Sequence, residues 1–178
     1  TQAQGYLFGR PCPVAELDFD DAIPTRSAGL ENNHALTARD VMLVRTSFSL
    51  VVPIQDTVSS LFYGRLFAIA PNLRRLFSED ITDQKRKLMA VLSSCVGRLH
   101  DFPALAPVVR ELGARHVGYG AKREHYASVA QALLWALEKG LGDLFTFEVR
   151  SAWIKVYDLL AAAMQAGAEE IETERAVS

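Results

Sequence analysis

Three polar side chains interrupt apolar helical patterns, and they are the residues of this chain best able to do chemistry. His116 lies four residues after Leu112, on the apolar side of its predicted helix. Gln84 lies four residues before Leu88, on the apolar side of another predicted helix, and Tyr63 stands inside a third apolar segment. An imidazole can bind a metal ion, whereas an amide and a phenol can donate hydrogen bonds to a bound ligand.

Spacing alone leaves a structural role open for each of these side chains. A buried histidine, glutamine or tyrosine more often makes a hydrogen bond within the core than binds a ligand. Each nevertheless needs a partner, because an unpaired buried polar group costs about 1–3 kcal/mol. Helical bundles build cofactor sites from inward-facing side chains of this kind. The pattern therefore admits either three separate structural hydrogen bonds or one shared cavity between helices.

The elements that must position these residues are all helical. Thr37 and Asp40 form a capping box that predicts a helix to about residue 52, which Pro53 stops. No segment of any length alternates with a period of two, so we expect an all-α domain. Further helices are expected at about residues 54–70, 71–77, 82–99, 104–117, 123–141 and 146–166.

The sequence divides into three parts. Residues 1–36 are rich in glycine and proline, carry an acidic run at residues 16–21 and lack an apolar period, which predicts an N-terminal extension that is flexible or wrapped on the domain. Residues 37–167 form one helical domain, and residues 168–178 form a C-terminal tail. The acidic run Glu169–Glu172 in this tail is expected to be solvated.

Composition argues against several classes of protein. The 178 residues carry a formal net charge of −2 with scattered lysine and arginine, so neither nucleic acid nor an anionic membrane is an expected partner. The longest apolar run, Ala132–Leu137, is too short for a membrane span, and without a secretory signal pattern we expect a cytoplasmic protein. Cys12 and Cys95 make neither a disulfide framework nor a zinc motif, so two reduced thiols are expected.

Five sequence motifs occur together in the order and spacing of a known family. They are Leu61–Phe67, Pro71–Phe77, Asp83–Met89, Leu112–His116 and Ser151–Tyr157. Through them, residues 38 to about 167 resemble the globins, in particular bacterial single-domain globins, the globin part of flavohaemoglobins, and neuroglobin. The resemblance implies a globin fold around haem b, which is iron protoporphyrin IX.

On one side of that haem the resemblance implies the attachment of the iron. His116 falls on the position of the proximal iron ligand. Phe77 falls on the position of the phenylalanine that packs against the haem ring, and Tyr126 matches a proximal-side tyrosine of flavohaemoglobins.

On the other side the resemblance implies a gas-binding pocket. Tyr63, Gln84 and Leu88 fall on the distal positions, and the usual distal histidine of vertebrate oxygen carriers is absent. The hydroxyl and amide would donate hydrogen bonds to a bound gas and slow its release. Lys87 and Arg115 would neighbour the haem propionates, although a role as plain surface charges is equally open.

The implied function is the binding of dioxygen, nitric oxide and carbon monoxide. One expectation is a bacterial haemoglobin for oxygen transport or nitric oxide detoxification, the latter as a nitric oxide dioxygenase supplied by a separate reductase. The alternatives are a gas-sensing module or the haem domain of a longer protein. Two positions depart from the family. Ala168 occupies the place of a proximal acid of flavohaemoglobins, with Glu169 beside it, and Phe48 replaces the usual first-helix tryptophan.

Overall fold

The computed structural model describes residues 36–177, and its regular structure there consists of helices without a strand. The expected all-α class is therefore confirmed for this part of the chain. The predicted extension lies outside the described residues except for Leu36, and Cys12 lies outside them as well.

Six α-helices follow the expected order, connected by turns and short 3₁₀ segments. They are α1 Ala38–Val51, α2 Gln55–Ile69, α3 Thr82–Arg98, α4 Phe102–Gly118, α5 His125–Leu141 and α6 Phe147–Val177. The predicted short helix at residues 71–77 is the 3₁₀ helix Pro71–Leu76. The largest difference from expectation is α6, which continues beyond residue 166 and includes most of the predicted tail.

The capping box at the start of α1 is present. The Thr37 side chain accepts a hydrogen bond from the Asp40 backbone N–H, and the Asp40 carboxylate accepts one from the Thr37 backbone. Lys155 of α6 pairs with the same carboxylate at 3.2 Å. Burial raises the pKa of Asp40, but the hydrogen bonds from Thr37 and Lys155 outweigh burial and hold the pKa below its ordinary value of 3.8. These contacts attach the start of the domain to its last helix.

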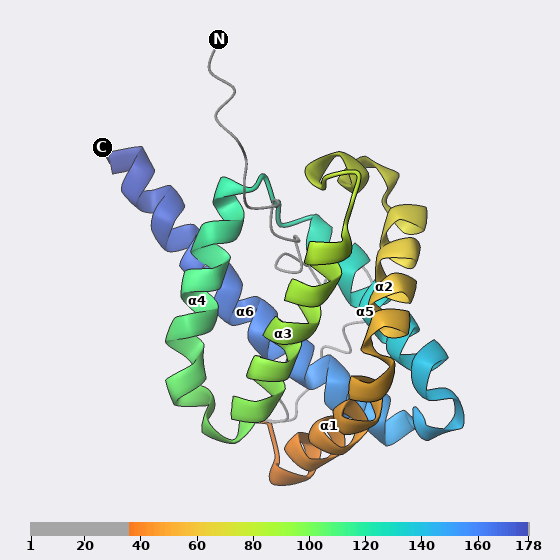
Figure 1. Cartoon of the computed structure of the whole chain (residues 1–178). Coiled ribbons are helices and arrows are strands. Elements are labelled where there is room, and N and C mark those ends of the chain that lie inside the picture. Colours follow the sequence, from red (N-terminus) through yellow and green to blue (C-terminus); the bar gives the residue numbers. More distant parts are fainter. Residues whose placement is uncertain (1–35, 178) are drawn as a thin grey trace, which may run out of the picture.

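The helices pack in pairs around one core (Figure 1). α4 lies along α6, α2 packs against α5, and α1 crosses α6. At the α1–α6 crossing, the rings of Phe48 and Trp153 are 6.2 Å apart, and the Trp153 indole N–H donates to the Ser47 hydroxyl at 2.9 Å. Phe48 therefore fills the first-helix aromatic position against Trp153. α3 lies in front of α6 and faces α4 across a cavity (Figure 1).

One helical stretch among the described residues, Ala38–Ile69, is long and apolar enough to cross a membrane by length and composition alone. The stretch contains α1, the 3₁₀ turn Val52–Ile54 with Pro53, and α2. Its Val44, Phe62 and Leu66 side chains are fully buried in the core. One such stretch is weak evidence for a membrane span, because a core helix of a globular domain can pass the same test.

Candidate functional site

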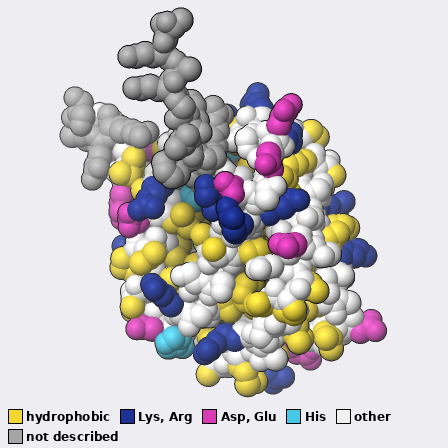
Figure 2. Space-filling model, in the orientation of Figure 1, with side chains coloured by type: hydrophobic (Ala, Val, Ile, Leu, Met, Phe, Trp, Pro, Cys, Tyr) yellow, Lys and Arg dark blue, Asp and Glu magenta, His cyan; other side chains and the backbone are white. Residues whose placement is uncertain are grey.

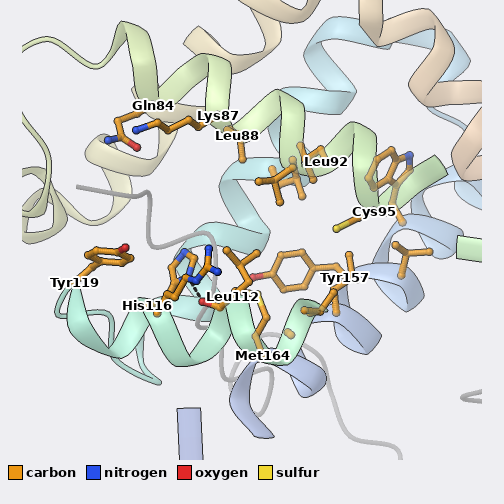
Figure 3. A pocket seen from close by; sticks show the side chains of 18 residues that line it. Gln84, Lys87, Leu88, Leu92, Cys95, Leu112, His116, Tyr119, Tyr157 and Met164 are labelled. Carbon is orange, nitrogen blue, oxygen red and sulfur yellow. Dashed lines mark hydrogen bonds between the residues drawn. The ribbon is translucent and has the colours of Figure 1, made fainter. Parts of the chain in front are cut away.

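A cavity of about 450 Å³ separates α3 from α4, and residues of α6, among them Tyr157 and Met164, also line it (Figure 3). Its volume falls in the range of about 300–1,000 Å³ that is typical of small-molecule sites. The lining is largely apolar, with a few polar side chains. Residues that line it from the three helices include Gln84, Leu88, Leu92, Leu112, His116 and Met164.

The α3 side of the cavity carries a buried amide. Gln84 is 1% exposed, and within residues 36–177 neither its amide nitrogen nor its amide oxygen has a hydrogen-bond partner. Leu88 lies one helical turn further along the same face. An unpaired buried amide is costly, and at the cavity wall it could form hydrogen bonds with a molecule bound there.

The α4 side carries the imidazole of His116, which is 3% exposed and points into the cavity opposite Gln84 (Figure 3). Its Nδ1 lies 2.6 Å from the backbone carbonyl oxygen of Leu112, one turn earlier. A carbonyl can only accept, so Nδ1 carries a proton, and in the neutral imidazole the lone pair is then on Nε2. A histidine binds a metal through that lone pair, and a hydrogen bond from the other ring nitrogen fixes the orientation of the ring.

Tyr119 is a cavity residue that sequence reasoning missed. It follows His116 by three residues, at the C-cap of α4, and its ring meets the imidazole edge-on at 6.0 Å between centroids. The signal was present in the sequence, because residues three apart on a helix share a face. The flanking Gly118 and Gly120 instead indicate the end of a helix.

Tyr63 and Phe77, two of the expected site residues, do not line the cavity but lie behind Gln84. Tyr63 is 1% exposed, and its hydroxyl donates to the backbone carbonyl of Gln84 at 3.3 Å. The Phe77 ring packs edge-on against the Tyr63 ring at 5.6 Å. Tyr126 of α5 is fully buried and also lies outside the lining. The structure thus brings Gln84, Leu88 and His116 together at the cavity. The three aromatic residues are buried in the core but do not line the cavity.

Lys87 and Arg115 stand at the exposed rim of the cavity, on α3 and α4. Arg115 pairs with Glu111 one turn earlier, and both side chains are largely exposed. Basic and acidic side chains lie near one another on this face of the molecule (Figure 2). Lys87 and Arg115 at the rim could therefore bind anionic groups of a ligand, while Arg115 also forms a surface ion pair with Glu111.

The acid that flavohaemoglobins place near the proximal ligand has no buried counterpart at the aligned positions. Ala168 is 7% exposed and carries no acid. Glu169 points to the surface, with its side chain 67% exposed and a carboxylate oxygen 3.9 Å from Arg123. The acid is therefore missing at this position, as the sequence indicates.

Cys95 lines the inner part of the cavity as a free thiol. Burial raises its pKa to about 11, so the thiol is protonated at neutral pH. A buried protonated thiol is unreactive, and a free thiol at Cys95 agrees with the expected reduced state of this residue.

Comparison with known proteins gives matches over most of the described chain. The family model described as Globin matches residues 60–164. Neuroglobin from Chaenocephalus aceratus is 28% identical over 146 residues, which cover 74% of this chain and 92% of that protein. The flavohemoprotein of Bacillus subtilis (strain 168) is 29% identical over 133 residues, which cover 72% of this chain and 33% of that protein. A crystal structure of the closed form of the HGbRL globin domain is 38% identical, with a TM-score of 0.35, and the match covers 78% of this chain and 98% of that one.

Proposed function

The chain belongs to the globin family, whose members bind haem and small gaseous ligands, and we propose that it binds dioxygen on a haem b that His116 holds. The observation that carries this proposal is the buried amide of Gln84, which faces His116 across the cavity and lacks a partner within the described residues. A gas bound between the two would supply that partner.

The residues present fit a haem group. The cavity has an apolar lining of ligand size, a buried imidazole on one wall and cationic side chains at its rim. His116 would hold the iron through Nε2, while Lys87 and Arg115 would lie nearest to the propionates. When bound, the haem iron supplies the coordination site for a diatomic gas.

The chain's own residues then perform three tasks. The Leu112 carbonyl holds the imidazole of His116 in one orientation through the Nδ1 hydrogen bond. The Gln84 amide N–H donates a hydrogen bond to the gas, and such donors favour a ligand that carries partial negative charge. Leu88 and Leu92 form apolar cavity walls that disfavour water near the gas.

Absorption spectra of the ferric, ferrous, oxygenated and carbonyl forms test the proposal. We expect a stable oxygenated form, and we expect the ferrous and carbonyl spectra of a histidine-ligated haem. Failure to take up haem, or immediate oxidation of the ferrous protein in air, would contradict it.

The enzymatic form of this proposal is nitric oxide dioxygenation. In that reaction nitric oxide, dioxygen and one electron combine to give nitrate, and the electron comes from a separate reductase. The match to a flavohemoprotein and the Gln84 amide at the cavity wall support it, whereas the surface position of Glu169 argues against a strong electron push from the proximal side.

Nitrate formation tests the enzymatic proposal directly. The ferrous protein is mixed with nitric oxide in air, together with a flavin reductase and its nicotinamide donor. We expect repeated turnover to nitrate that requires the reductase. A single stoichiometric conversion without turnover would restrict the protein to oxygen binding.

A further inference from the structure

Two glycines let α4 and α6 meet backbone against backbone. A Cβ atom built on Gly113 would overlap the carbonyl oxygen of Met164 and lie 2.7 Å from its Cα. A Cβ atom on Gly167 would in the same way overlap the carbonyl oxygen of Arg110 and lie 2.8 Å from its Cα. The obstacles are backbone atoms, which cannot swing aside as a flexible side chain can, so neither position admits a larger residue without separating the helices.

This crossing lies directly beside the groups that present the imidazole. Gly113 follows Leu112, whose carbonyl oxygen holds Nδ1 of His116 at 2.6 Å. Met164, on the other side of the crossing, lines the same cavity as His116. Since α4 is continuous from Phe102 to Gly118, any displacement at Gly113 moves the Leu112 carbonyl and the imidazole together.

α4 has little else to hold it in place. It packs extensively against α6 and contacts α3 at few points, because the cavity lies between α3 and α4 (Figure 3). α3, by contrast, packs against both α1 and α2. The distance between the imidazole and Gln84 therefore depends on how closely α4 approaches α6.

We propose that Gly113 and Gly167 are positioning residues for the haem ligand, because their close crossing sets how far His116 reaches toward the iron. The inference rests on the proposed haem ligation by His116. An added methyl group at either glycine would separate α4 from α6, strain the bond between the imidazole and the iron, and loosen the haem.

The test compares Gly113→Ala and Gly167→Ala with the wild-type protein loaded with haem. Resonance Raman of the ferrous protein without gas reports the iron–histidine stretching frequency, and transfer to an excess of an apo-globin acceptor reports the haem dissociation rate. We expect a lower stretching frequency and haem loss faster by about tenfold, the scale seen when groups that orient a metal ligand are changed.

Two matched controls separate positioning from general stability. Gly118→Ala lies in the same helix, where an added Cβ meets open space, so both readouts should stay at their wild-type values. Leu105→Ala removes a side chain of α4 that is 2% exposed and lies outside the cavity lining. It should lower the melting temperature of the protein while leaving the stretching frequency unchanged.

The outcomes distinguish this inference from the proposed function. Absence of an iron–histidine band in the wild-type protein would overturn the proposed ligation and the inference with it. A wild-type band that both glycine variants leave unshifted would overturn the inference alone. If one glycine variant fails to fold, the other decides. If both fail while Leu105→Ala folds, the crossing has a structural role only, and the inference is wrong.

Discussion

The α3 and α4 walls of the cavity differ in how their polar side chain is bonded and in how their helix is packed. On α3, the Gln84 amide is buried and has no hydrogen-bond partner among the described residues, although its helix is packed against two others. On α4, the His116 imidazole has its backbone partner, although its helix rests mainly on α6. The α3 wall thus combines a well-supported helix with an unsatisfied polar group, and the α4 wall combines a hydrogen-bonded imidazole with a helix placed by a single close crossing.

Under the proposed function, the α3 wall would serve the gas and the α4 wall would serve the haem. An amide left without a partner in the polypeptide costs stability, and a molecule that arrives in the cavity can recover that cost. An imidazole that its neighbour already orients loses little conformational entropy when it binds a metal, which favours a permanent bond. Variants at each wall should therefore affect different properties.

Removal of the α4 ligand should have the largest effect. His116→Ala deletes the imidazole, so we expect loss of normal haem ligation and of the stable oxygenated form. Ferrous and carbonyl absorption spectra measure this change. A ferrous spectrum identical to that of the wild-type protein would show that another residue binds the iron.

On the α3 wall, Gln84→Leu should change oxygen binding and stability in opposite directions. Loss of the donor should speed oxygen dissociation by about tenfold, which corresponds to roughly 1.4 kcal/mol. The same change removes an unpaired buried amide, so the haem-free protein should gain about 1 kcal/mol in its free energy of unfolding. Stopped-flow oxygen release and urea unfolding measure the two effects.

Gln131→Leu provides the matched control, because Gln131 is an exposed glutamine on α5. It should alter neither the oxygen dissociation rate nor the unfolding free energy by a comparable amount. If Gln84→Leu destabilised the haem-free protein, the amide would have a partner within the folded chain, and the contrast between the two walls would fail.

A smaller effect is expected one layer behind α3. Tyr63→Phe removes the hydroxyl that donates to the backbone carbonyl of Gln84 at 3.3 Å. Without this bond, the backbone that carries the Gln84 side-chain amide is held less firmly. Loss of one neutral hydrogen bond of about 0.7 kcal/mol corresponds to a roughly threefold faster release of oxygen. Stopped-flow rates equal to those of the wild-type protein would show that this hydroxyl neither touches the gas nor positions Gln84.

The smallest effect is expected on the α4 side, at Glu169. Its carboxylate is exposed and pairs with Arg123, so Glu169→Gln should change neither the ferrous spectrum nor the oxygen dissociation rate by more than about twofold. Absorption spectra and stopped-flow oxygen release measure the two quantities. A clear shift in the spectrum would mean that this acid influences the proximal imidazole after all.

Much of the fold was predictable because local rules determine it. The capping box at Thr37 and Asp40 marks the first helix start, and the apolar period of residues 82–99 marks α3. The end of α6 was wrong by about eleven residues, since the apolar period ends before the helix does. Residues 167–177 continue as helix, and Glu169–Glu172 in that segment are mostly exposed. Periodicity reports burial, so it does not report the end of a helix that is mostly exposed, as this one is from Glu169 onward.

The candidate site was predictable in part. The placement of Gln84, Leu88 and His116 on inward helical faces follows from spacing, and the structure brings these three to one cavity. Tyr63 and Phe77 were expected at the same cavity, but their rings pack against each other behind Gln84. Which of several inward-facing aromatic residues reaches a cavity depends on how the helices pack, and spacing along one helix carries no information about that.

The sequence by itself therefore determined the helices, their inward faces and the identity of the polar groups that those faces carry. Only the tertiary structure decided that the amide of Gln84 lies buried opposite His116 without a partner in the described chain, and that Gly113 and Gly167 bring two backbones into contact. The physical reason is that periodicity arises within one helix, whereas the pairing of polar groups and the approach of backbones depend on residues that are distant in the chain.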